Sequence, residues 1–179
     1  MRIITLLCCL FLLNISTVFA KKEIAFDELK NYRVHSEQLS SSGLASNKLS
    51  LIADNNYSHI INLIPGDYTN DEKQAVALGM SYQQIAVDWE NPKLSDFHRF
   101  AYYLHNTPKN EKTLVHCKLN YRASTFAYLY QVIVKKEDQA KAKEQLLSVW
   151  QPTPTWLNYM DTVLEYYNAL PNEPLSNSK

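Results

Sequence analysis

The chain has 179 residues, of which 46% are apolar, so it can fold around a packed core and is not intrinsically disordered. Basic and acidic side chains balance at 18 each, which excludes the overall positive field that holds nucleic acid or an anionic membrane surface. With only 3 glycines, a glycine-rich repeat is also excluded.

Residues 1–20 are expected to be a cleaved export signal. A basic start precedes an almost unbroken apolar run over 3–13, and the small residue Ala20 ends the segment before the chain turns polar. The apolar run is too short to span a bilayer comfortably, so no stable membrane anchor is expected after cleavage. We therefore expect a periplasmic or secreted protein.

The rest of the chain is predicted to be one domain over 21–170, followed by a flexible tail over 171–179 that contains two prolines. Cleavage of the signal would remove Cys8 and Cys9 and leave Cys117 alone. No intramolecular disulfide could then form, so stability has to come from the packed core.

The predicted elements alternate between strands and helices. In chain order they are a strand at 32–34, a turn at 40–43, a helix at about 46–53, a strand at 59–63, a helix from 69 to about 78 with a capping box of Thr69 and Glu72, a strand at 82–87, a loop at 88–92, a helix capped by Ser95 with its apolar stripe at 97–104, a strand at 113–116, a buried helix at 123–134, and amphipathic helices at 136–150 and 155–170. This order predicts an α/β fold with a mainly parallel central sheet flanked by helices.

The segment Val115–Ser124, VHCKLNYRAS, carries the candidate chemistry. A predicted strand runs directly into Cys117, a short polar loop follows, and a buried helix begins. The start of a helix favours a thiolate and a bound oxyanion, because its N–H groups are unpaired and its dipole is positive there. Arg122 adds a permanent charge that can bind two oxygens at once.

These residues resemble the cysteine-dependent tyrosine and dual-specificity phosphatases, whose loop reads His-Cys-X-X-Gly-X-X-Arg-Ser/Thr. Residues 55–63, NNYSHIINL, are similar to the strand before that family's first loop, and 82–88, YQQIAVD, to the strand that presents its acidic residue. The resemblance implies the fold of that family and metal-independent hydrolysis of phosphomonoesters through a phosphocysteine. The partner would be a phosphorylated protein or a small-molecule phosphomonoester.

The resemblance also implies a role for each residue. Cys117 would attack phosphorus and Asp88 would protonate the leaving oxygen, with Glu90 as the nearest alternative acid. His116 would be a buried group that hydrogen-bonds to the loop and tunes the thiol. The phosphate would be bound by the loop residues Lys118, Leu119, Asn120, Tyr121, Arg122 and Ser124, and Ser124 could also donate to the sulfur.

The chain departs from the family pattern at two positions. Arg122 lies five positions after the cysteine instead of six, and Asn120 replaces the glycine. Either one residue is deleted, or the loop keeps its length and the arginine moves forward by one. The second interpretation keeps Ser124 at the hydroxyl position, and Asn tolerates the left-handed conformation that glycine would supply. Ala123 would then occupy the usual arginine position.

The same spacing raises two alternatives. Single-domain rhodaneses, which move sulfur through a cysteine persulfide, carry Cys-X-X-Gly-X-Arg with the arginine five positions on, as here. A phosphate-loop domain that binds anions without turnover is the third hypothesis.

We expect no metal and no cofactor, because the mature chain has no cysteine pair and the remaining histidines lack metal-ligand spacing. These histidines are His35, His59, His98 and His105.

Overall fold

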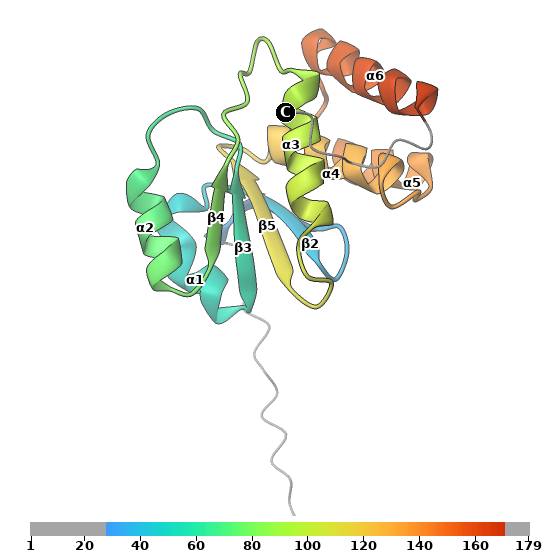
Figure 1. The fold of residues 1–179 in the computed structure, drawn as a ribbon. Coiled ribbons are helices and arrows are strands. Elements are labelled where there is room, and N and C mark those ends of the chain that lie inside the picture. The colour runs from blue at the N-terminus through green and yellow to red at the C-terminus, as the bar shows by residue number, and fades with distance from the viewer. Residues whose placement is uncertain (1–27, 171–179) are drawn as a thin grey trace, which may run out of the picture.

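The computed structural model describes residues 28–170, so the predicted export signal and the C-terminal tail lie outside the described residues. A five-stranded sheet in the order β1-β2-β5-β3-β4 forms the centre of this part of the chain (Figure 1). Only β1 is antiparallel to its neighbour, and the other strands run parallel. The strands are β1 (Lys30–Val34), β2 (Leu39–Gly43), β3 (Tyr57–Asn62), β4 (Ser81–Gln84) and β5 (Lys112–Cys117).

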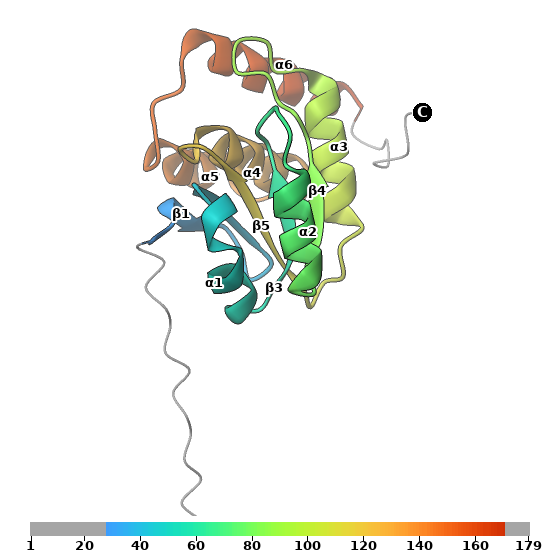
Figure 2. The ribbon, with the colours of Figure 1, turned by 90° about the vertical axis from the view of Figure 1, so that its left-hand side faces the viewer.

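Six α-helices of the described chain cover both faces of this sheet. Figures 1 and 2 show α1 and α2 on one side of the sheet and α4, α5 and α6 on the other. The helix α3 packs against α4 and α6 on that second side. The helices are α1 (Leu49–Asp54, preceded by a 3-10 turn at Ser46–Lys48), α2 (Thr69–Ala77), α3 (Leu94–His105), α4 (Tyr121–Ile133), α5 (Gln139–Leu147) and α6 (Pro154–Ala169). The predicted α/β architecture is confirmed.

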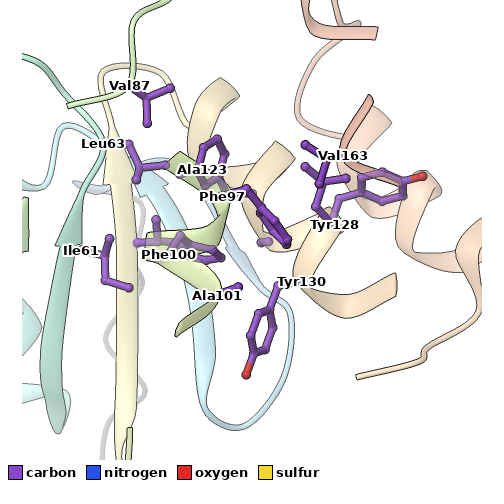
Figure 3. Packing of buried hydrophobic residues seen from close by; sticks show 14 of the residues in the cluster. Ile61, Leu63, Val87, Phe97, Phe100, Ala101, Ala123, Tyr128, Tyr130 and Val163 are labelled. Carbon is purple, nitrogen blue, oxygen red and sulfur yellow. The ribbon is translucent and has the colours of Figure 1, made fainter. Parts of the chain in front are cut away.

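Each face of the sheet has its own apolar core. The larger core lies under α3, α4 and α6, where the rings of Phe97, Phe100 and Phe126 are fully buried against one another. Figure 3 shows the packing of this core around the first two of these rings. Burying such a side chain contributes about 1.5–3 kcal/mol. Because α4 lies in the middle of this core, its position relative to β5 is fixed.

The predicted turn at 40–43 is wrong, because these residues form the buried strand β2. Two of its three serine hydroxyls have partners, whereas the buried hydroxyl of Ser42 has none among the described residues. Ser40 Oγ accepts a hydrogen bond from Tyr57 Oη at 2.7 Å, and Ser41 Oγ lies 2.8 Å from His35 Nε2. Satisfied hydroxyls carry little penalty for burial, so a serine-rich segment can be a central strand.

The caps predicted for α2 and α3 are also wrong. Asp67 Oδ1 accepts hydrogen bonds from the N–H and the hydroxyl of Thr69, at 2.9 and 2.7 Å. At the start of α3, Asp96 Oδ2 accepts the N–H of Lys93 at 3.1 Å, so Asp96 takes the place expected for Ser95. In both cases a carboxylate accepts an N–H group near the start of the helix, and the predicted hydroxyl caps are not formed.

Several predicted boundaries differ from the structure, and three of them lie near the site or after it. The helix α4 begins at Tyr121, two residues early, α5 begins only at Gln139, and β4 ends at Gln84. Beyond β4, Ile85 N still donates to Asn62 O at 2.8 Å before the chain leaves the sheet. No helix within the described range is long and apolar enough to cross a membrane.

Candidate active site

Cys117 is the last residue of β5, the central strand, and it is 2% exposed. Parallel strands β2 and β3 flank β5, so their carboxyl ends meet beside the cysteine. Gly43 is paired with Cys117, and Leu44 N donates to Cys117 O at 3.0 Å. Residues 118–120 then connect the strand to the start of α4. This is the edge of a parallel sheet where ligands commonly bind in α/β proteins.

A pocket of about 470 Å³ opens at this edge. Its walls come from the segment after β2, the segment after β3, and the cysteine loop. It is lined by Leu44, Ala45, Ser46, Asn47, Ile64, Tyr68, His116, Cys117, Lys118 and Leu119. Lys118 and Leu119 are exposed at its wall, whereas the side chain of Tyr121 turns away and stacks on Trp150 with ring centroids 4.8 Å apart.

The cysteine loop keeps the left-handed residue that the family pattern requires. Asn120 has φ 69° and ψ 2°, so asparagine takes the conformation usually supplied by glycine, as the sequence predicted. Its Nδ2 donates to Asn31 O at 2.6 Å, and Asn31 Nδ2 donates back to Leu119 O at 3.0 Å. This reciprocal pair fastens the loop to β1. The sequence carried no signal for Asn31, which lies 89 residues away from Asn120.

Gly43 lies directly under the same loop. A Cβ atom at this position would be 2.6 Å from Lys118 O, 2.9 Å from Leu119 Cα and 3.0 Å from Asn120 N. All three are backbone atoms, which cannot swing aside as a side chain can. The approach of β2 to the loop therefore requires glycine here, a constraint that the predicted turn concealed.

The N-terminus of α4 is free of side-chain caps. Asn120 makes no side-chain cap, and the first turn contains no acidic residue. Ser124 Oγ donates to Tyr121 O at 3.1 Å, so the hydrogen bond expected toward the sulfur is not formed. An uncapped helix N-terminus beside the cysteine leaves N–H groups and the positive end of the helix dipole available to an anion.

Arg122 brings a buried charge to the same place. It is 7% exposed, and its Nη1 donates to Leu63 O at 2.9 Å and to Val87 O at 2.8 Å. Its Nε is buried with no partner, and none of the ion pairs within residues 28–170 includes this guanidinium. A buried charge without a counter-ion costs several kcal/mol, so the site favours an anion that would supply one.

Asp88 lies in the loop after β4, next to the Val87 carbonyl that Arg122 binds. The side chain is exposed, and its Oδ1 accepts the N–H groups of Glu90 and Asn91 at 2.8 and 3.1 Å. This leaves Oδ2 as the oxygen that can carry a proton. The structure thus ties the loop bearing the predicted acid to the helix that begins at the cysteine loop.

His116 is fully buried, and neither ring nitrogen has a partner among the described residues. The hydrogen bond expected from this ring to the loop is therefore not formed. Burial lowers the pKa of His116 to about 3, which keeps the imidazole neutral. A neutral ring behind Cys117 adds no positive charge to the site.

Among residues 28–170, no group of three or more His, Cys, Asp or Glu side chains could hold a metal ion. The donors without partners at the start of α4 are backbone N–H groups and the Nε of Arg122. Donors of this kind bind oxyanions.

No family model matches the chain, and no curated protein matches it. Among solved structures it is similar to a DUF442 protein of Shewanella putrefaciens CN-32 assigned as a phosphatase, with 32% identity and a TM-score of 0.68. The match covers 78% of this chain and 94% of the other. The chain belongs to the DUF442 family. Its membership confirms the predicted resemblance to cysteine-dependent tyrosine phosphatase-like proteins.

Other solved structures are less similar to this chain and support the fold alone. PTPMT1 is 18% identical, with a TM-score of 0.64 over 78% of this chain and 98% of that chain. TpbA of P. aeruginosa is also 18% identical, with a TM-score of 0.65 over 81% of this chain and 92% of that chain. These two structures have the tyrosine phosphatase-like fold, and the DUF442 match supports a phosphatase in general.

Proposed function

We propose that this DUF442 protein is an exported, metal-independent phosphomonoester hydrolase that acts through a phosphocysteine at Cys117. The observation that carries the proposal is the buried guanidinium of Arg122, whose Nε has no partner and which has no counter-ion in the described chain. Two carbonyl groups hold its Nη1, so Nε and Nη2 would be free to bind two oxygens of one phosphate. An arginine one position earlier than in the family pattern would thereby still bind the phosphate.

The first step would transfer the phosphoryl group to the protein. The Sγ of Cys117 attacks phosphorus, an S–P bond forms, and the P–O bond of the ester breaks. Asp88 Oδ2 gives its proton to the leaving oxygen. Arg122 and the N–H groups at the start of α4 bind the equatorial oxygens, and each such donor is worth about 10²–10³ in rate.

The second step would regenerate the protein. The carboxylate of Asp88 takes a proton from water, the oxygen attacks phosphorus, and the S–P bond breaks. Inorganic phosphate and the thiolate of Cys117 are the products. The same carboxyl thus acts as acid and then as base, and its contribution is about 10²–10⁴ in rate.

The substrate would be a phosphorylated protein or a small-molecule phosphomonoester. In the relatives, TpbA has been crystallised with phosphotyrosine and PTPMT1 with PI(5)P, each of which carries a phosphomonoester group. Export is proposed from residues 1–20 alone, whose basic start, apolar run and terminal Ala20 fit a signal peptide.

The test is hydrolysis of 4-nitrophenyl phosphate by protein beginning at Lys21, with EDTA present, from acidic to neutral pH. Cys117→Ser is the matched variant, since it exchanges only sulfur for oxygen in a side chain that is 2% exposed. We expect turnover in the wild type and none in Cys117→Ser. Equal activity in both proteins would contradict a phosphocysteine.

The sulfurtransferase remains the alternative, because Arg122 has the five-residue spacing of that class. Its discriminating assay is the release of thiocyanate from thiosulfate and cyanide. Thiocyanate release without phosphate hydrolysis would support sulfur transfer. Stabilisation by phosphate that persists in Cys117→Ser, with no turnover by the wild type, would instead support an anion-binding module.

A further inference from the structure

All three tryptophans of the chain meet beside the loop that carries Asp88. Trp89 follows Asp88 directly, Trp150 lies between α5 and α6, and Trp156 is in the first turn of α6. The ring of Trp89 is 5.5 Å from that of Trp150 and 5.2 Å from that of Trp156, measured between centroids. Tyr121, the first residue of α4, completes the group at 6.3 Å from Trp89. We call these four residues the tryptophan cluster.

One hydrogen bond joins the cluster to the loop backbone. Trp156 Nε1 donates to Trp89 O at 3.1 Å, and the side chain of Trp156 is completely buried. Trp150 Nε1 is also buried but has no partner in the described chain. Of these two indoles, Trp156 therefore fixes the loop backbone directly, whereas Trp150 contributes ring packing.

The loop is fastened on the other side of Asp88 as well. Val87 O accepts the hydrogen bond from Arg122 Nη1 at 2.8 Å. The carbonyl groups immediately before and after Asp88 are thus both bound, one by α4 and one by α6. Asp88 Oδ1 is itself held by Glu90 N at 2.8 Å, so neither the backbone nor the carboxyl swings freely.

We propose that Trp156 is a positioning residue for the acid step, holding the Asp88 loop against the start of α6 through the carbonyl of Trp89. The proposal rests on the proposed function, in which Asp88 is the acid. A general acid works only within hydrogen-bond reach of the leaving oxygen, and a displacement of about 1 Å can lower the rate roughly 10²-fold. The helix α6, which lies outside the cysteine loop, thereby takes part in the reaction.

The test compares Trp156→Phe with Val163→Ala. Phenylalanine keeps an aromatic ring in the cluster but removes the N–H donor. Val163 is fully buried on the same helix and makes no hydrogen bond to the Asp88 loop. Val163→Ala therefore weakens the packing of α6 but keeps the hydrogen bond from Trp156 to Trp89 O. Each variant is assayed with 4-nitrophenyl phosphate, a good leaving group, and with phenyl phosphate, whose leaving oxygen depends more on protonation.

We expect Trp156→Phe to lower kcat for phenyl phosphate about tenfold more than for 4-nitrophenyl phosphate, with KM changed little. Val163→Ala should change both substrates by the same factor. In an Asp88→Asn background, Trp156→Phe should have no further effect on the ratio of the two rates, since the acid is already absent. A structural role alone would lower both rates together.

Equal losses on the two substrates in Trp156→Phe would overturn the proposal while leaving phosphatase activity intact. Failure of the proposed function would look different, because the wild type would then be inactive or Cys117→Ser would be active. Should Trp156→Phe not fold, benzothienylalanine at this position replaces the N–H by sulfur and keeps the bicyclic shape. An unchanged substrate ratio in that protein would equally overturn the proposal.

Discussion

Replacing Gly43 by alanine would test whether β2 sets the shape of the cysteine loop. The new Cβ would stand 2.6 Å from Lys118 O, where ordinary contact begins at 3.4 Å, so the two must separate by about 0.8 Å. The atoms in the way belong to the backbone between the cysteine and α4. Overpacking of this kind destabilises by about 1–3 kcal/mol.

The same displacement should reduce activity as well as stability. A shift of about 1 Å in a reacting group can lower the rate roughly 10²-fold, so we expect kcat/KM of Gly43→Ala to fall between about tenfold and 10²-fold. Urea unfolding and hydrolysis of 4-nitrophenyl phosphate measure the two effects. Ser42→Ala is the matched control, because Ser42 is buried on the same strand and its hydroxyl has no partner in the described chain. Wild-type stability and activity in Gly43→Ala would refute the reasoning.

Three other substitutions and one pH series follow from the site. Arg122→Lys cannot both bind two carbonyl groups and offer two further N–H donors, so kcat/KM should fall about 10²–10³-fold, and a loss below tenfold would contradict the phosphate role. Asp88→Asn should lower the rate on alkyl phosphates about 10²–10⁴-fold, whereas unchanged rates would point to another acid such as Glu90. Burial lowers the pKa of His35 to about 4 and of His116 to about 3, so below pH 6.5 the unfolded chain takes up protons that the folded chain refuses. The free energy of unfolding should therefore be highest above pH 6.5 and fall by about 1.4 kcal/mol per pH unit for each imidazole down to about pH 4. His116→Leu should remove about half of this pH dependence. A flat urea-unfolding series between pH 6.5 and 4.5 would contradict the burial of these rings.

The local part of the site could be predicted from the sequence. A β-branched strand ending in Cys117 and a buried helix after it are short-range patterns, and they place the cysteine at a helix N-terminus. The left-handed conformation of Asn120 followed from the intrinsic tolerance of asparagine, and the structure has φ 69° there. Local chemistry decides these features, so no distant partner had to be known.

Features that depend on distant partners were missed. The serines of β2 look like a turn until Tyr57 and His35 are known to bond their hydroxyls. Asn31 holds the cysteine loop from 89 residues away, and Trp156 reaches a carbonyl 67 residues earlier in the chain. Contacts over such separations leave no periodicity or spacing in the sequence, so only the folded structure brings them together.

The central claim, a covalent phosphoryl group on Cys117, can be tested directly by rapid acid quench. Asp88→Asn protein would be mixed with 4-nitrophenyl phosphate, quenched and digested. The mass of the peptide that contains Cys117 would then be measured by mass spectrometry. Without the base for the second step, the account predicts that this peptide gains the mass of one phosphoryl group and that Cys117→Ser gains none. Release of nitrophenol with no modified peptide at any quench time would contradict it.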